Sequence, residues 1–125
     1  MSDFAAKPFG VGIDVADPAT MADSWQGLTS YERTEDTPGR VFLVHAQRAT
    51  AGIYLHTVPE PRPPGKNRLH LELWVDHLET ARARVAELGG RLVADYSDRS
   101  DVEPDMSFMV FEDPEGNVFC LGERG

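Results

Sequence analysis

The sequence predicts an α+β protein made of two units, each with one strand, then one helix, then three more strands. Strand-like and helix-like runs occur in this order in both halves of the 125-residue chain. The proline-rich segment 59–67 separates the halves, because proline cannot donate to a strand ladder. We therefore expect one domain, 1–125, with module one at about 9–58, a linker at 59–67 and module two at about 68–123.

Eight segments have the alternation and the β-branched or aromatic content of strands. They are Phe9–Val15, Ser30–Arg33, Arg40–Ala46, Gly52–Val58, Arg68–Val75, Arg91–Asp95, Met106–Phe111 and Asn117–Gly122. The polar loop before the seventh segment carries carboxylates that lack the glycine and closing Glu of an EF-hand, so we expect a solvated loop. These carboxylates belong to Asp101, Glu103 and Asp105.

Two segments predict helices. In the first, Asp17 is a typical N-cap and Pro18 a typical first helical residue. Its apolar side chains recur at helical spacing, at Met21, Ala22, Trp25 and Leu28. In the second, Asp76 and Glu79 have the spacing of a capping box, and Gly89-Gly90 ends the helix. Its apolar stripe is Leu78, Ala81, Val85 and Leu88.

The halves also match each other in sequence pattern at two offsets, which indicates an internal repeat. A shift of 60 residues pairs Gly10 with His70, and a shift of 66 pairs Tyr54 with Cys120. The longer loop of the second half explains the change of offset. Identity between the halves is low, so the repeat is one of pattern.

Composition excludes several classes of protein. Apolar content of 41% and charged content of 26% are typical of a soluble globular protein, and no run approaches a membrane span. The net charge of −9 disfavours nucleic acid and anionic membranes as partners. With no signal peptide pattern and a single cysteine, Cys120, which excludes an internal disulfide, we expect a cytoplasmic protein.

Two stretches of the second half, "RLHLELWVDHLETARARVAELGGRLV" and "FMVFEDPEGNVFCLGE", resemble the vicinal oxygen chelate superfamily. This superfamily includes glyoxalase, bleomycin-resistance and dioxygenase proteins, and the chain looks most like a glyoxalase-like branch without assigned activity. The resemblance extends from about Phe9 to Glu123. It implies that the two modules curl into a mixed-sheet cup around a pocket, and that the chain forms a homodimer.

The resemblance also implies where a metal would be held, at Gly10, Tyr54, His70 and Cys120. Only His70 is a typical ligand, because glycine has no side chain, tyrosine is a rare donor and cysteine replaces the usual Glu. We therefore expect no metal cofactor. If a divalent metal does bind, His56 and His70 are the expected ligands.

The strand alternation places His70, Glu72 and Trp74 on one face, and His56 on the face of Tyr54. The residues expected to line a small-molecule pocket are Asp14, Tyr54, His56, His70, Glu72, Trp74 and Cys120. His70 and Glu72 are the candidates for a catalytic base. Cys120 is interpreted as a small buried residue rather than a nucleophile activated by His70.

Three functions remain open from the sequence. The first is a protein that binds a small organic molecule without metal, as a binder or as a lyase or isomerase. The second is a metal-dependent lyase or dioxygenase that uses His70. The third is a drug-sequestering protein of the bleomycin-resistance type, which binds without turnover.

Overall fold

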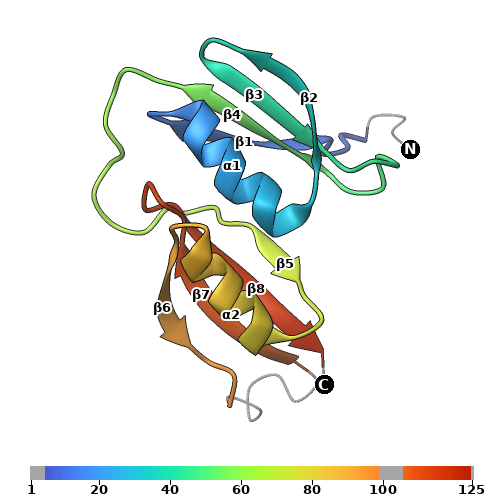
Figure 1. Ribbon diagram of the computed structural model, residues 1–125, viewed down its shortest axis with the longest axis vertical. Coiled ribbons are helices and arrows are strands. Elements are labelled where there is room, and N and C mark those ends of the chain that lie inside the picture. The colour runs from blue at the N-terminus through green and yellow to red at the C-terminus, as the bar shows by residue number, and fades with distance from the viewer. Residues whose placement is uncertain (1–4, 99–105, 125) are drawn as a thin grey trace. The chain divides into compact units, whose positions relative to one another are not determined.

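The computed structural model describes residues 5–98 and 106–124 and divides into two compact units, Met1–Arg62 and Pro63–Gly125 (Figure 1). The division falls within the proline-rich segment. Each unit holds one helix and one four-stranded sheet, so the α+β class expected from the sequence is confirmed. The three loop carboxylates Asp101, Glu103 and Asp105 lie outside the described residues.

The first unit contains one mixed sheet. Its elements are β1 (Gly10–Val15), α1 (Pro18–Thr29), β2 (Glu32–Thr37), β3 (Arg40–Val44) and β4 (Gly52–Thr57). The strand order is β1-β4-β3-β2, and β1 runs parallel to β4 whereas the other pairs are antiparallel. The two strands at opposite ends of the unit's chain therefore lie side by side, with the helix as the crossover between β1 and the rest.

Helix α1 begins as the sequence predicts. The Asp17 carboxylate accepts a hydrogen bond from the Thr20 backbone N–H (3.2 Å), and Pro18 opens the helix. Hydrogen bonds from Thr20 lower the pKa of Asp17, as expected for a carboxylate that caps a helix. The helix buries one side against one face of the sheet. The buried side chains are Met21, Ala22 and Trp25 of the helix and Val15, Val41, Leu43, Ile53 and Leu55 of the strands.

The second unit repeats this plan. Its elements are β5 (Glu72–Trp74), α2 (Leu78–Glu87), β6 (Arg91–Asp95), β7 (Met106–Glu112) and β8 (Val118–Arg124). The strand order β5-β8-β7-β6 and the parallel pairing of β5 with β8 reproduce the first unit. The core between α2 and its sheet is formed by Leu78, Ala81, Val85, Met109, Phe111, Phe119 and Leu121.

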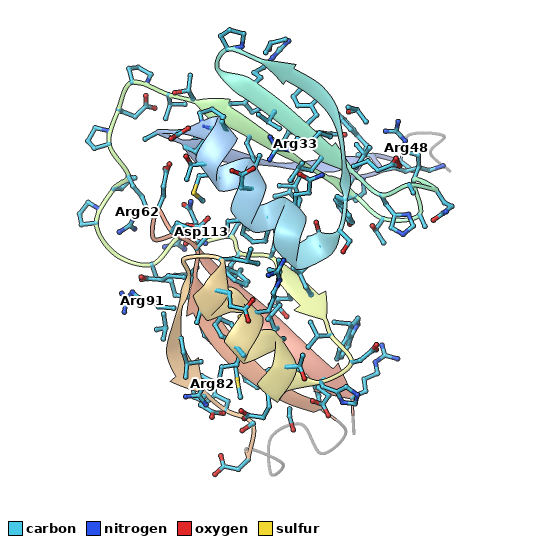
Figure 2. All side chains as sticks on the ribbon, in the orientation of Figure 1. Arg33, Arg48, Arg62, Arg82, Arg91 and Asp113 are labelled. Atoms are coloured by element: carbon cyan, nitrogen blue, oxygen red, sulfur yellow. The ribbon has the colours of Figure 1, made fainter. Side chains whose placement is uncertain are left out.

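A tight turn joins β7 to β8. The Asp113 side chain, which is 5% exposed, accepts hydrogen bonds from the backbone N–H groups of Glu115 and Asn117 (3.0 and 2.9 Å). Gly116 takes a φ of 89°, a conformation that glycine adopts without strain. Figure 2 labels Asp113 in this turn. The turn fixes the antiparallel register of β7 and β8, and β8 carries Cys120 of the candidate site.

Two local predictions for the second unit are wrong. Helix α2 begins one residue later than the capping box implies: His77 is the N-cap and makes no side-chain capping bond. Instead, the Leu78 backbone N–H donates to Glu123 Oε1 at 2.6 Å. The strand expected over 68–75 is only Glu72–Trp74, because the chain bends at residues 68–69 before it joins the sheet.

The second strand of the first unit is also displaced from its predicted position. We expected it at Ser30–Arg33, and it lies at Glu32–Thr37. Ser30 ends helix α1 in the left-handed conformation, with a φ of 61°, and its backbone N–H donates to Gln26 O. The helix cap therefore takes Ser30, the first residue of the predicted strand, while Glu32 and Arg33 lie in the strand as predicted.

Candidate ligand-binding site

Each sheet has one face covered by its helix and an opposite face, called here the open face. In the second unit, Cys120 lies on the open face, because its neighbours Phe119 and Leu121 point into the core beneath α2. Strand β5 pairs in parallel register with β8, Glu72 opposite Cys120 and Trp74 opposite Gly122. The register therefore places Glu72 and Trp74 on the open face, as the strand alternation predicts.

His70 lies beside Cys120, two residues before β5 begins. Its Nδ1 is 3.8 Å from Cys120 Sγ and 3.8 Å from Glu72 Oε2. The imidazole is 23% exposed, whereas the Glu72 side chain is 71% exposed. The same ring nitrogen thus faces both a buried thiol and a carboxylate that reaches solvent. The three residues that the sequence places on adjacent strands come together here.

An asparagine side chain holds the segment that carries His70. Asn67 Oδ1 accepts from the Val118 backbone N–H (2.7 Å), and Asn67 Nδ2 donates to the carbonyl oxygens of Val118 (3.1 Å) and Leu69 (2.6 Å). The amide therefore occupies the place of a backbone peptide beside β8, before the true ladder starts at Leu71. No sequence motif indicates this role, because the partner is 51 residues away.

The Cys120 thiol is held in its protonated form. Burial raises its pKa above the ordinary value, and the Glu72 carboxylate raises it further, against an opposing effect of Lys66. A protonated thiol is a poor nucleophile. Cys120 also packs with Val110 and Val118 in a small apolar cluster. Both observations favour the interpretation of Cys120 as a buried, unreactive residue.

Trp74 forms a flat apolar surface beside this group. Its side chain packs over Gly122, where an added Cβ would lie 3.2 Å from Trp74 Cζ3. The Arg124 guanidinium stacks over the indole at 4.3 Å from the ring centroid, a cation–π contact. Trp74 nevertheless remains 54% exposed. The sequence pattern did not identify Arg124 as a site residue. Strand spacing predicts the face on which Arg124 lies, but it does not predict the contact with Trp74.

The open face of the first unit carries a different set of side chains. Tyr54, His56 and Asp14 lie on it, with Gly12 opposite Tyr54 and Asp14 opposite His56 in the parallel register of β1 and β4. Phe42 of β3 contacts both aromatic neighbours, with ring centroids 4.6 Å from Tyr54 and 5.8 Å from His56. The predicted shared face of Tyr54 and His56 is thus present.

In the first unit, the position equivalent to His70 is Gly10, and the Tyr54 ring lies over it. A Cβ added to Gly10 would lie 2.0 Å from Tyr54 Cε2, so the tyrosine ring occupies the space that a larger side chain at position 10 needs. Within residues 5–98 and 106–124, no three His, Cys, Asp or Glu side chains are grouped closely enough to hold a metal ion. His56 and His70 belong to different units, and their joint binding of a metal stays a prediction.

The two βαβββ units have the fold of the glyoxalase, bleomycin-resistance and dioxygenase proteins, as the sequence resemblance implies. The model of the glyoxalase-like domain family matches residues 10–122. The chain therefore belongs to the glyoxalase-like domain family. Comparison with curated proteins gives no match. In the described part of the chain, no helix has the length and apolar character needed to cross a membrane.

Solved structures share the fold at low sequence identity. A glyoxalase/bleomycin resistance protein/dioxygenase family enzyme from Burkholderia phytofirmans PsJN matches with a TM-score of 0.79 and 18% identity, over 96% of this chain and 100% of that one. A mutant of the fosfomycin resistance protein FosX from Listeria monocytogenes, complexed with Mn(II) and 1S,2S-dihydroxypropylphosphonic acid, matches with a TM-score of 0.77 and 14% identity, over 98% and 93%. A putative glyoxalase family protein from Bacillus anthracis matches with a TM-score of 0.68 and 16% identity, over the whole of both chains.

Proposed function

We propose that this protein binds a small organic molecule on the open face of its second unit, without a resident metal. The observation that carries the proposal is that three different side chains share one strand face. A half-buried imidazole, His70, lies 3.8 Å from an exposed carboxylate, Glu72, and the exposed indole of Trp74 lies further along the same face. A flat apolar surface with a few convergent polar groups suits a small organic ligand.

The same side chains can move a proton. His70 and Glu72 are close enough for one ligand atom to contact both, and either can act as a general base toward a carbon acid. Such a step would make the protein a lyase or an isomerase. Cys120 takes no part beyond shaping the floor, because its thiol stays protonated. His70 and Glu72 are therefore the candidate catalytic pair, with Trp74 as the wall against which the ligand packs.

A metal-dependent reaction is the alternative, since the FosX structure contains Mn(II). The donors of this chain suit Mn(II) poorly, because that ion prefers oxygen and imidazole ligands. The glycine at position 10 offers no donor and lies beneath the Tyr54 ring, and Cys120 offers a protonated sulfur. For these reasons the residues at these positions do not fit a resident Mn(II).

A ligand screen followed by NMR tests the proposal. Small carbonyl and enol compounds are screened by thermal shift, and each hit is titrated into ¹⁵N-labelled protein. We expect chemical shift changes at the backbone amides of β5 and β8, and at least a tenfold loss of affinity in His70→Ala. His77→Ala is the matched control, because His77 is an exposed histidine of the same unit without a side-chain capping bond. Equal losses in both variants would contradict the proposal.

The same titrations separate the remaining functions. Turnover of a bound hit by metal-free protein supports the lyase or isomerase, whereas tight binding without product supports a drug-sequestering protein. The homodimer is likewise a proposal, and it predicts twice the chain mass of 13.8 kDa in light scattering.

A further inference from the structure

One histidine of the first unit organises the loop that joins β3 to β4. The Nδ1 atom of His45 accepts hydrogen bonds from the backbone N–H groups of Gln47 (3.1 Å) and Ala49 (3.4 Å). The His45 carbonyl oxygen accepts a third, from the Arg48 N–H at 2.9 Å. Figure 2 labels Arg48 in this loop. The loop 45–51 therefore depends on an imidazole without a proton on Nδ1, because only a bare ring nitrogen accepts.

The backbone of this loop has an unfavourable conformation at its centre. Arg48 takes a φ of 57°, in the left-handed region that costs free energy for a residue with a Cβ atom. The residues on either side of it, Gln47 and Ala49, are the two that donate to the imidazole. Residues 46–50 are exposed, so burial contributes little to holding them. The hydrogen bonds to His45 are thus the contacts that keep Arg48 in this conformation.

A tyrosine anchors the other end of the loop. The Tyr31 hydroxyl donates to the Ala51 carbonyl oxygen at 3.2 Å and is also hydrogen-bonded to the Thr50 hydroxyl. The Tyr31 ring lies edge-on to the His45 imidazole, with ring centroids 6.0 Å apart. Hydroxyl groups do not titrate in neutral or mildly acidic solution. The anchor at Thr50 and Ala51 is therefore independent of pH in the range where a histidine changes its charge.

Two charged residues neighbour His45 along the chain and across the sheet. Glu32 of β2 pairs with the residue before His45, and its side chain is exposed. Arg48 lies within the loop and is exposed as well. Tyr31 is the titratable group whose ring faces the imidazole, and neither the last turn of α1 nor the start of β4 carries a charged residue. One charge of each sign therefore borders the ring, whose direct polar contacts are the backbone N–H groups of the loop.

We propose that the loop 45–51 is a pH-sensitive switch, closed while the His45 imidazole is neutral and released when Nδ1 takes up a proton. A protonated imidazole has two donors and no acceptor. The N–H groups of Gln47 and Ala49 then face another N–H group instead of a lone pair, and the loop moves away from the ring. Histidine gains its charge in mildly acidic solution, between about pH 8 and pH 5.

The release has a hinge. Residues 46–49 leave the imidazole, whereas Thr50 and Ala51 stay on the Tyr31 hydroxyl, so the opening does not spread into β4. The switch lies in the first unit, and it does not depend on the proposed function of His70.

Amide and imidazole NMR of the labelled full chain, from about pH 8 to about pH 5, tests the switch. At the upper end we expect ring ¹⁵N shifts of an imidazole with its proton on Nε2. On acidification, the amide protons of Gln47 and Ala49 shift upfield, as amide protons do when they lose an acceptor, along the same curve as the His45 ring. The amides of Thr50 and Ala51 change less.

Three results of this titration would overturn the inference. The first is a proton on Nδ1 of His45 at the upper end of the range. The second is a ring that titrates while the amides of Gln47 and Ala49 keep their shifts. The third is a ring that stays neutral throughout.

Substitutions at His45 separate the imidazole from the carboxyl groups, which also gain protons on acidification. The side-chain oxygen of His45→Asn accepts from an N–H two residues on and does not titrate, so its loop should stay closed throughout. His45→Phe keeps a ring but has no acceptor, and its loop should be open throughout. The matched control is His77→Asn, because His77 is exposed and makes no side-chain capping bond. This variant should respond to pH like the wild type.

The amide spectrum of each variant shows whether its fold is intact. Loop amides of His45→Asn that titrate like those of the wild type would overturn the inference, because another group would then cause the response. Loss of the response in His77→Asn would overturn it as well. If His45→Asn does not fold, His45→Phe decides: amides of Gln47 and Ala49 that still titrate would contradict the switch, and amides fixed at their acidic positions would support it.

Discussion

The two units of this protein have the same strand order but carry different side chains at matching positions on their open faces. In the first unit, position 10 is glycine and the Tyr54 ring lies over it. In the second, the equivalent position is His70, whose imidazole lies 3.8 Å from the Cys120 thiol. The fold therefore fixes where a side chain projects, and the pair of residues on the first and last strands decides what the face can bind.

The difference also explains why the metal site implied by the family is hard to build in this chain. A ligand residue at position 10 requires an open space above β1, and Tyr54 fills that space. The second unit has an imidazole, and on the last strand beside it stands a thiol whose pKa is raised, at the position where the family resemblance implies a carboxylate. The two units therefore differ from the implied ligand set in different ways: a ring fills the space at position 10, and a thiol stands at position 120.

The largest expected effect comes from Asn67, whose side-chain Oδ1 accepts from the Val118 N–H, whereas in the first unit the backbone carbonyl of Phe9 accepts from the corresponding Gly52 N–H at 3.1 Å. Asn67→Ala removes three hydrogen bonds and leaves both backbone groups of Val118 without their partner. We expect a loss of about 2–3 kcal/mol in the free energy of unfolding. Denaturant unfolding measures this loss, and NOEs between the His70 ring and Cys120 report whether the histidine keeps its place.

Asn67→Asp sharpens this comparison because it keeps the acceptor for the Val118 N–H and loses both donors. Its stability should fall between those of the wild type and Asn67→Ala. If Asn67→Ala keeps the wild-type stability and the His70 to Cys120 NOEs, the hydrogen bonds of the Asn67 amide do not position His70.

The next effect distinguishes two glycines of one strand face. Gly10→Ala forces a methyl group into the Tyr54 ring, and we expect it to cost about 1–3 kcal/mol of stability. Gly12→Ala meets nothing within 4 Å and should change stability by less than about 0.5 kcal/mol. Both are measured by denaturant unfolding, and the double variant Gly10→Ala/Tyr54→Ala should recover part of the loss. Equal costs at the two glycines would show that the ring does not lie where we describe it.

A smaller effect is expected at the start of helix α2. Glu123→Gln weakens the bond that the Leu78 N–H donates and removes a negative charge from the positive end of the helix. We expect a loss of about 1 kcal/mol in unfolding free energy. Asp76→Asn is the control, because the sequence names Asp76 as the cap and the structure gives the role to Glu123. A larger loss of stability in Asp76→Asn would mean that Asp76 caps the helix, as the capping-box pattern predicts.

The smallest effect is a pH dependence of stability. The folded state raises the pKa of the Cys120 thiol, so its contribution is complete at neutral pH. As the pH rises above the ordinary thiol range, the unfolded chain ionises first and this contribution declines. Unfolding free energies measured from neutral to alkaline pH should therefore fall more steeply for the wild type than for Cys120→Ala. Parallel curves would mean that burial does not perturb the thiol.

The sequence predicts this fold well where the determinants are local. Asp17 and Pro18 start α1 as expected, because both act within the first turn of the helix. The cap of α2 could not be predicted, since Glu123 arrives from a strand 45 residues away. The short β5 has the same kind of cause: Asn67 takes the place of a strand residue only when β8 is already beside it.

The candidate site was also predicted in part: the sequence indicates which residues share a face, but not how their side chains pack. Strand alternation and the two offsets of the repeat bring His70, Glu72 and Cys120 to one face, as the structure has them. They do not identify Arg124 or the uncovered Gly12, because stacking and empty space depend on the conformations of neighbouring side chains. Residue types on a face can be read from a sequence, whereas the space between them cannot.

The most direct test of the central claim is a metal analysis of protein purified without chelator, beside His70→Ala. The account predicts no stoichiometric metal in either protein, together with ligand binding at β5 and β8 of the metal-free wild type. About one metal ion per chain in the wild type, lost in His70→Ala, would contradict it. That result would make His70 a metal ligand and would favour the alternative, a metal-dependent reaction.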